Sequence, residues 1–399
     1  MENAIYGGRV DNSYDFNVLQ TYLKQYMNGN VLAGGGGRNK ATERGLNMIL
    51  PTTNRQEYIR LIESLPDADT PSLFGLPPNV ERSVQRAQSS QVIGQLKKLA
   101  RSMAMFGGAG SSKKFNREQW RTELGPIIEL WDRLTKSDRS VLSRPSGGDD
   151  SKKEALPLTQ FVQMENAFAY DILSLVDTNM KAIKRVVYGS GLLTPQIQAH
   201  GAALMANTVP MAWEKKWEGP ENPQAWLKAV VLKKVALGRW GGKMDSLKSG
   251  GGGGGGGVRL DLSELFNPGT FLMALRQQTA RVARMQMDSL VLSSSFGDEL
   301  AAAPLPVSIT GLLMQGATFE DGRLELSGAG ASELCTMNAC TLAFTQSASG
   351  HKKKESGKLD VPLYFSSTRE KLLTPISINV QGQAEDWVIA GVALFLSSD

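Results

Sequence analysis

Few of the residues on which catalytic and metal sites depend occur in this sequence. Its 399 residues include two cysteines and two histidines. So few cysteines cannot form a disulfide scaffold, and their scarcity is typical of proteins from a reducing compartment. Histidine and cysteine also supply zinc ligands, catalytic bases and nucleophiles, so their scarcity argues against a zinc centre and against a nucleophilic triad.

The spacing of these residues leads to the same prediction. Cys335, Cys340 and His351 offer three ligands where a structural zinc site takes four, and His200 falls in a different predicted domain. Neither histidine lies beside a G-x-S-x-G turn of the kind that carries a catalytic serine. We therefore predict no catalytic residue, no metal site and no cofactor site in this chain.

Long apolar runs and a strong charge of one sign are also missing. The longest apolar run, WVIAGVALFL at 387–396, is half the roughly 20 residues that a membrane helix needs, and it predicts a buried strand. No secretory signal is apparent at residue 1. The 44 basic and 39 acidic residues give a net charge of +5, which requires no acidic partner. We therefore expect a soluble intracellular protein without membrane insertion and without a nucleic-acid partner.

Glycine, by contrast, is abundant, and it marks the boundaries between parts of the sequence. Interruptions rich in glycine or charge occupy 33–45, 144–154 and 249–257, and the last of these contains eight consecutive glycines. Such a tract cannot hold a secondary structure, so it predicts a linker or a surface loop.

Two glycine-rich stretches come close to a phosphate-binding loop, G-x-x-x-x-G-K-[ST]. GGAGSSKKF at 107–115 has Ser112 in place of the second glycine and Lys114 in place of the hydroxyl residue. GGGGRNKAT at 34–42 fails in a similar way. A stand-alone nucleotide-binding enzyme that uses 107–115 stays as an alternative function. A basic module that binds nucleic acid is a second alternative. The lysine run HKKKESGK at 351–358 is expected to be a solvated loop, and the alternative is that it contacts an acidic partner.

Most of the sequence before residue 303 is predicted to be helical. Apolar residues recur at helical spacing within 16–27, 54–65, 77–103, 116–134 and 158–189. Three further segments begin with a capping residue followed by proline, which is typical of a helix start: TPQIQAH, NPQAWLKAV and NPGTFLMALRQQTARVARM.

After about residue 303 the pattern changes to short strands. Five runs rich in branched and aromatic residues are separated by Gly, Pro and Asp: LPVSITGLLMQGATF, DGRLELS, DVPLYFSS, PISINV and WVIAGVALFL. Asp321-Gly322 is a hairpin signal. The predicted fold class is therefore α+β, with a mainly helical first two-thirds followed by a small antiparallel β-barrel.

The last predicted helix is expected to pack against this barrel. Its apolar stripe, and the two arginines chosen with it, are Phe271, Leu272, Leu275, Val282, Arg276 and Arg281. The alternative is that the apolar residues are ordinary core and the arginines are solvated. Because the polyglycine tract precedes this helix, we expect the helices before Ser249 to be mechanically separate from the strands.

The N-terminal segment AIYGGRVDNSYDFNVLQTYLKQYM predicts a structural joint ahead of a docking helix. Its glycines can adopt positive φ or admit another backbone, and Asn12 or Ser13 can cap the helix. The joint residues are Tyr6, Gly7, Gly8, Arg9 and Asp11. Arg9 is expected to pair with an aspartate, Asp11 or Asp15, and the alternative is that it contacts the phosphates of a neighbouring module. The apolar stripe expected on the docking helix is Phe16, Leu19, Leu23 and Met27.

Seven segments, in order, resemble the extreme C-terminal region of dynein heavy chains. They are AIYGGRVDN, FGLPPN, WEGPENP, FNPGTFLMALRQQTAR, ITGLLMQGATFEDGRL, DVPLYFSSTRE and WVIAGVALFL. The resemblance runs from Ala4 to Leu396. FGLPPNVERSVQRAQSSQVIGQL and LDLSELFNPGTFL are more similar to the cytoplasmic class that drives intraflagellar transport than to other classes.

The resemblance implies three regions. Residues 1–78 would be the C-terminal part of the sixth AAA+ module, a helical lid whose other half lies further upstream. Residues 79–303 would be the helical part of the dynein C-terminal domain, and residues 304–399 its β-barrel part. ATP and magnesium would be bound by upstream modules, so the parent heavy chain would be the ATPase while this segment is non-catalytic.

The implied function is to cap the ring of a minus-end-directed microtubule motor and to couple or restrain its rearrangements, in retrograde intraflagellar transport. The implied partners are the rest of the motor ring and, through the parent protein, a second heavy chain, light and intermediate chains, microtubules and intraflagellar-transport trains. The implied location is the cytoplasm and the cilium or flagellum with its axonemal cytoskeleton.

Overall fold

The structure is a computed structural model. It describes residues 10, 13–26, 54–64, 67, 76–106, 115–138, 140–144, 156–248, 258–320, 323–327, 333–346, 358–380 and 382–397. Several positions singled out above lie outside these residues. They are Tyr6, Gly7, Gly8, Arg9, Asp11, Met27, His351 and the glycine-rich stretches at 34–42, 107–114 and 249–257.

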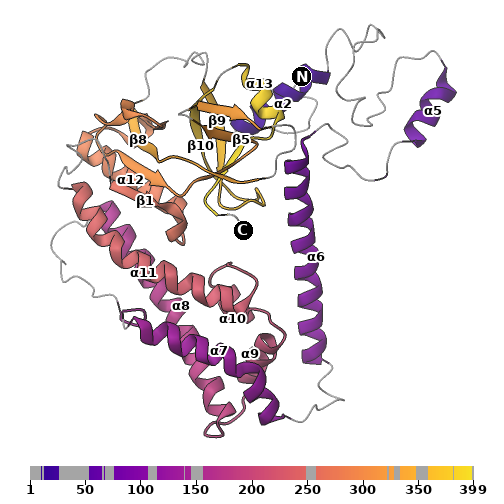
Figure 1. The fold of residues 1–399 in the computed structure, drawn as a ribbon, viewed down its shortest axis with the longest axis vertical. Helices are drawn as coiled ribbons and strands as arrows, with labels where there is room; N and C mark the ends of the chain where they lie inside the picture. Colours follow the sequence, from indigo (N-terminus) through magenta and orange to yellow (C-terminus); the bar gives the residue numbers. More distant parts are fainter. Residues whose placement is uncertain are drawn as a thin grey trace.

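A bundle of helices forms the lower half of the molecule in Figure 1. Its members are α7 (Arg117–Ser137), α8 (Pro157–Val187), α9 (Pro195–Met205), α10 (Met211–Glu214) and α11 (Pro223–Lys248). The central helix is α8, which contacts the other four. The starts at Pro195 and Pro223 confirm the capping signals, and Thr194 Oγ1 accepts a hydrogen bond from Ile197 N at 3.3 Å.

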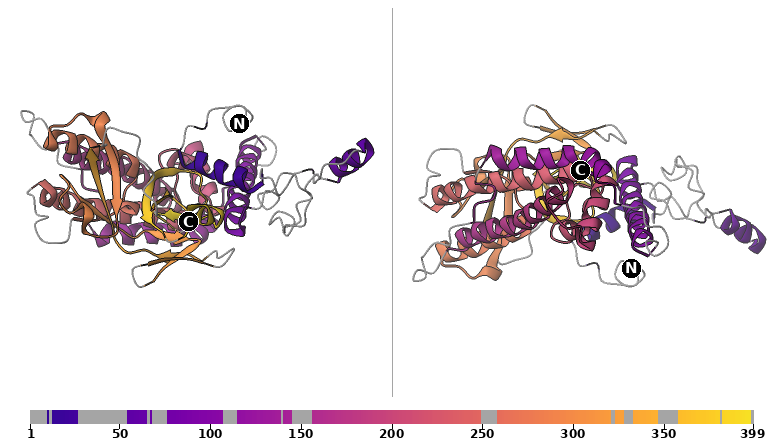
Figure 2. Two further views of the ribbon diagram at one scale, coloured as in Figure 1. Left: turned by 90° about the horizontal axis from the view of Figure 1, so that it is seen from above. Right: turned by 90° about the horizontal axis from the view of Figure 1, so that it is seen from below.

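Three helices precede the bundle in the sequence: α2 (Ser13–Tyr26), α5 (Arg55–Glu63) and α6 (Pro78–Phe106). Figures 1 and 2 show α6 beside the bundle rather than within it. Helix α2 packs on the strand region, and there the expected stripe is only half-buried at Phe16, Leu19 and Leu23. Tyr14 and Thr21 are the buried positions instead, because α2 meets its neighbours through a different face.

The strand region contains eleven short strands in the described residues: β1 (Val258–Asp261), β2 (Leu290–Ser295), β3 (Val307–Thr310), β4 (Leu313–Gln315), β5 (Ala317–Glu320), β6 (Arg323–Leu326), β7 (Cys335–Thr336), β8 (Cys340–Gln346), β9 (Lys358–Tyr364), β10 (Leu372–Asn379) and β11 (Ala393–Phe395). Two helices, α12 (Pro268–Ala283) and α13 (Ala384–Ile389), lie among them. The strands therefore begin earlier than predicted, since β1 and β2 both precede residue 303.

Among the described residues the strands form open sheets, so the predicted closed barrel is not supported. Their orders are β1-β3-β8-β2, β10-β9-β11-β4-β7 and β5-β6. The pairing is also mixed, because β1 is parallel to β3 and β11 is parallel to β9. Parallel pairing needs a crossover, and the connections that carry α12 and α13 provide it. The mixture of helix and sheet agrees with the predicted α+β class.

Two local predictions for the strand region have different outcomes. The hairpin signal is confirmed, since Glu320 pairs with Arg323 across residues 321–322. The apolar run at 387–396 is not one strand, because it completes α13, turns at Gly391 with φ of 67° and only then enters β11. That backbone conformation ends the helix, and it favours glycine.

One hydrophobic core runs through the bundle and the strands without interruption. Its largest fully buried side chains include Trp213, Trp226 and Trp240, and the rings of Trp213 and Trp226 stack with their centroids 5.6 Å apart. Among the described residues, no helix combines the length and the apolarity that crossing a membrane requires.

Substitution of Gly201 would test the packing of α9 against α7 in the bundle. A Cβ atom at Gly201 would lie 2.3 Å from a ring carbon of the buried Trp120, whereas a Cβ at Gly238 would meet nothing within 4 Å. We expect Gly201→Ala to lower the free energy of unfolding by about 1–3 kcal/mol through overpacking. The control Gly238→Ala should raise it by up to about 1 kcal/mol, because alanine is the better helix former. Urea denaturation measures both, and equal stabilisation by the two variants would contradict the contact between α7 and α9.

Candidate functional site at the junction of helices and strands

Helix α12 is held between the bundle and the sheets by its apolar side. Phe271 and Leu275 are fully buried. The Phe271 ring lies 5.7 Å from that of Phe161 on α8 and 5.4 Å from that of Trp240 on α11. The buried Gln278 accepts a hydrogen bond from the backbone at the start of α8. Because α12 packs on two bundle helices as well as on β8, it joins the two halves of the molecule.

The other residues chosen on α12 have separate environments. Leu272 is 7% exposed, whereas Val282, expected in the same stripe, is 56% exposed. Val282 lies in the last turn, just before Arg284 ends the helix with a φ of 54°. Arg276 Nε donates to the Met287 carbonyl at 3.0 Å and so fixes the segment beyond the helix. Arg281 is exposed.

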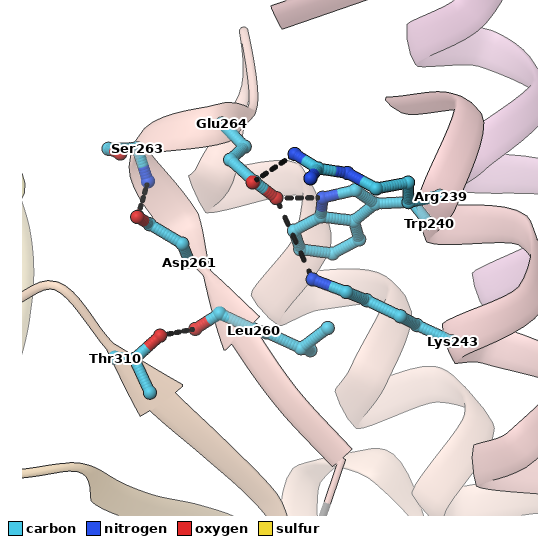
Figure 3. Close-up of polar contacts among 8 residues, drawn as sticks. All are labelled: Arg239, Trp240, Lys243, Leu260, Asp261, Ser263, Glu264 and Thr310. Carbon is cyan, nitrogen blue, oxygen red and sulfur yellow. Dashed lines mark hydrogen bonds and ion pairs between the residues drawn. The ribbon is translucent and has the colours of Figure 1, made fainter. Parts of the chain in front are cut away.

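Glu264 connects the end of β1 to helix α11 (Figure 3). Its carboxylate accepts a hydrogen bond from Trp240 Nε1 at 2.8 Å, and it pairs with Arg239 at 3.1 Å and Lys243 at 3.7 Å. Figure 3 also shows Asp261, which caps the short 3-10 turn Leu262–Glu264 by accepting from Ser263 N at 2.9 Å. No sequence motif indicates this cluster, because its partners are separated by the polyglycine tract.

Glu165 anchors the start of α12 from within the bundle. Its side chain on α8 is 3% exposed. One carboxylate oxygen accepts from Phe266 N at 2.7 Å, and the other accepts from Asn267 Nδ2 at 2.8 Å. Both oxygens are therefore satisfied, which a buried carboxylate requires. Its negative charge also lies at the N-terminal end of α12, where the helix dipole favours it.

Lys233 is a half-buried cation at the same junction. Its Nζ donates to the carbonyls of Ser263 and Leu265, and it lies 5.6 Å from the Trp217 ring centroid and 5.7 Å from that of Phe266. Burial lowers its pKa from 10.5 to about 8, and the neighbouring carboxylates, Glu165 first among them, oppose this effect. These contacts fix the β1–α12 connection.

A second junction attaches α6 to the strand region. The buried Asn79 donates through Nδ2 to the Ala390 carbonyl at 3.2 Å. Ser83 Oγ donates to the Ser367 carbonyl at 2.9 Å, and Arg86 donates to Ser367 Oγ at 3.2 Å. The first part of α6 is thus fixed to the loop between β9 and β10 and to the turn before β11.

The residues considered for metal binding or nucleophilic chemistry do not assemble in the part of the sequence that the structure describes. No group of three or more His, Cys, Asp or Glu side chains could hold a metal there. Burial raises the pKa of the Cys340 thiol to about 12, so this thiol is a poor nucleophile at neutral pH. His200 is buried in α9, and burial lowers its pKa.

Comparison with known proteins gives the family. A family model for the AAA lid domain of dynein heavy chains matches residues 1–80, and a model for the C-terminal domain of dynein heavy chains matches residues 86–396. The protein belongs to the dynein heavy chain family. Helix α6 therefore begins in the lid-matched segment and continues into the C-terminal domain.

The relatives indicate the class. The sequence is similar to "Cytoplasmic dynein 2 heavy chain 1" proteins. The identity is 37% for Tripneustes gratilla, 38% for Chlamydomonas reinhardtii and 36% for Homo sapiens, in each case over 100% of the present 399 residues. It is 22% identical to a cytoplasmic dynein heavy chain of Dictyostelium discoideum over 94% of its length. The 399 residues span 9% of the length of the cytoplasmic dynein 2 relatives. The predicted resemblance to the C-terminal region of dynein heavy chains is thus confirmed, and the similarity is to the cytoplasmic dynein 2 class.

Leu275 tests the role of α12 as the connection between bundle and sheets. Leu275→Asp places an unpaired charge in a fully buried position, which should lower the free energy of unfolding by several kcal/mol. Since Phe271 of α12 also packs on α8 and α11, we expect limited proteolysis to attack bundle and strands together, not the strands alone. Met273→Asp is the matched control, because Met273 is 49% exposed on the same helix. Digestion of the strands with the bundle left intact would contradict the shared core.

The lowered pKa of Lys233 makes the stability of the folded protein depend on pH. Because its folded-state pKa of about 8 is below 10.5, the unfolded state binds more protons between these values, and stability rises with pH. We expect this rise to contribute roughly 1–2 kcal/mol from pH 8 to pH 10, allowing for partial exposure. Lys233→Met should remove it, whereas the control Lys228→Met, on the exposed side of α11, should retain it. Urea denaturation at pH 8 and pH 10 measures the free energy of unfolding of each variant. An equal rise with pH in both variants would contradict the assignment of this effect to Lys233.

Proposed function

We propose that this protein is a non-catalytic segment that caps the motor ring of a dynein heavy chain and couples or restrains movements among its modules. The family match supports the proposal, as does the arrangement of α6. This helix is fixed at its first turns to the strand region by Asn79 and Ser83, and Lys97 forms an ion pair with Glu221 before the bundle helix α11 at 2.7 Å. It therefore links the lid-matched segment to both parts of the C-terminal domain.

The observation that carries the proposal is the exposed apolar side of α6. Val92 is 54% exposed, Ile93 43% and Leu96 59%. Val92 and Leu96 lie four residues apart and so share one face of the helix. Monomeric proteins rarely expose a contiguous apolar patch without a binding role. Since relatives extend far beyond this segment, we assign the face to contact with an upstream module of the same heavy chain.

The parent motor would carry the remaining properties. We propose that its ATP and magnesium sites lie upstream and that it acts with a second heavy chain, light and intermediate chains, microtubules and intraflagellar-transport trains. Retrograde intraflagellar transport and a location in the cytoplasm and cilium fit the similarity to cytoplasmic dynein 2 heavy chains. A stand-alone nucleotide-binding enzyme is the competing function, and saturable ATP–magnesium binding with turnover by the isolated 399-residue protein would favour it.

Leu96 provides the test in a complete heavy chain. We expect Leu96→Asp to weaken docking of α6, because a charge in an apolar contact typically costs several kcal/mol. The expected result is a change of roughly twofold or more in ATPase rate or single-motor run length. Stability of the 399-residue protein should stay within about 0.5 kcal/mol, since the position is exposed. The control is Leu192→Asp, at an 88% exposed position in the loop before α9.

Truncation of the heavy chain before Val80 gives the complementary measurement. If ATPase rate and run length are unchanged in both Leu96→Asp and the truncated motor, the coupling function is wrong.

A further inference from the structure

A cavity of about 370 Å³ lies where α2, α6 and the loop between β9 and β10 meet. This volume falls within the range of small-molecule pockets. Most of its wall is apolar or aromatic, and the residues include Val18, Tyr22, Val80, Val84, Tyr364 and Val388. The function proposed above does not use this cavity.

Arg369 brings a positive charge to the wall of this cavity. Its Nη2 donates to Gln315 Oε1 at 3.0 Å and to the Gly391 carbonyl at 2.7 Å, and its guanidinium carbon lies 5.6 Å from the Phe395 ring centroid. The residue has a φ of 59°, so the loop holds it in the left-handed region. These contacts fix the guanidinium in place before any ligand arrives.

The Nε of Arg369 is a buried donor without a hydrogen-bond partner among the described residues. No described carboxylate pairs with this guanidinium, although buried charges are normally paired. Because Arg369 lines the cavity, an anionic acceptor that enters it would meet an arginine whose charge has no described carboxylate partner. Carboxylate oxygens make strong, charge-assisted bonds with arginine.

Acidic residues that line the cavity restrict the class of ligand that it can bind. Asp15 and Glu370 also line the cavity, and both are exposed. Their negative charges would repel a dianionic phosphate more than a single carboxylate. We propose that the cavity binds a small monocarboxylic acid, with its carboxylate at the Arg369 guanidinium and its apolar body packed against the valines of α2 and α6.

Such a ligand would stabilise the contact between the lid-matched segment and the C-terminal domain. It would touch α2, which lies within residues 1–80, and Arg369, which lies within residues 86–396. A ligand that binds only the assembled arrangement shifts the equilibrium toward it. This effect is independent of whether α6 docks on the ring.

Phenylacetate is a suitable probe, because it joins one carboxylate to an apolar ring. We expect saturable binding to the 399-residue protein with a Kd on the order of 1 mM or tighter, seen by NMR titration and by an increase in Tm. Phenylacetamide, a neutral compound of similar shape, and inorganic phosphate should each bind at least about tenfold more weakly, since neither places a single carboxylate at Arg369.

Two variants locate the site. Arg369→Gln should abolish binding, but it also removes the bonds to Gln315 and Gly391. Val84→Phe therefore fills the cavity while leaving Arg369 in place, and it should weaken binding at least about tenfold with unchanged helix content. Val282→Phe, at a 56% exposed position on α12 that does not line the cavity, is the matched control and should bind as the unmodified protein does.

Three results would overturn the proposal. These are equal binding of phenylacetate and phenylacetamide, unchanged binding by Val84→Phe, and the absence of saturable binding. The titration is repeated on the complete heavy chain. Binding to the 399-residue protein but not to the complete heavy chain would show that an upstream group occupies the cavity, and it would overturn the small-molecule site as well.

Discussion

The packing of Phe271 against Phe161 and Trp240 is the contact on which the architecture depends. It brings together α12, α8 and α11, although α12 and α11 are separated in the sequence by eight glycines. Burial of a phenylalanine side chain contributes about 1.5–3 kcal/mol, and here it also fixes the helix that leads into the strand region. The helices and the sheets therefore share one core instead of forming separate units.

The polar cluster at this junction follows from that packing. Once α12 is in place, the β1–α12 connection lies against the bundle, and its polar groups lose contact with water. Glu165 and Lys233 are the groups that compensate, the first by accepting from Phe266 N and the second by donating to two carbonyls. A buried charge is tolerated only when such partners are present, so these residues act as structural anchors.

Helix α6 has a different role because it is attached mainly at one end. Its first turns are bound through Asn79 and Ser83, while its apolar side around Leu96 stays exposed. A helix that begins in the lid-matched segment and continues into the C-terminal domain is suited to transmit movement between them. Membership of the dynein heavy chain family gives this arrangement its functional meaning, since the relatives continue well beyond the present 399 residues.

The sequence by itself determined the local features of this protein. Proline at the first helical position set the starts of α9, α11 and α12, because the ring of proline fixes φ at a helical value. The Asp321-Gly322 pair predicted the hairpin between β5 and β6. The seven motifs, in their order along the sequence, indicated the family. Only the tertiary structure decided that the sheets stay open, that Gly391 divides the last apolar run, and that Glu264 meets Trp240. The physical reason is that periodicity and turn signals report the conformation of neighbouring residues, whereas sheet closure, burial and ion pairing depend on partners brought together from distant parts of the sequence.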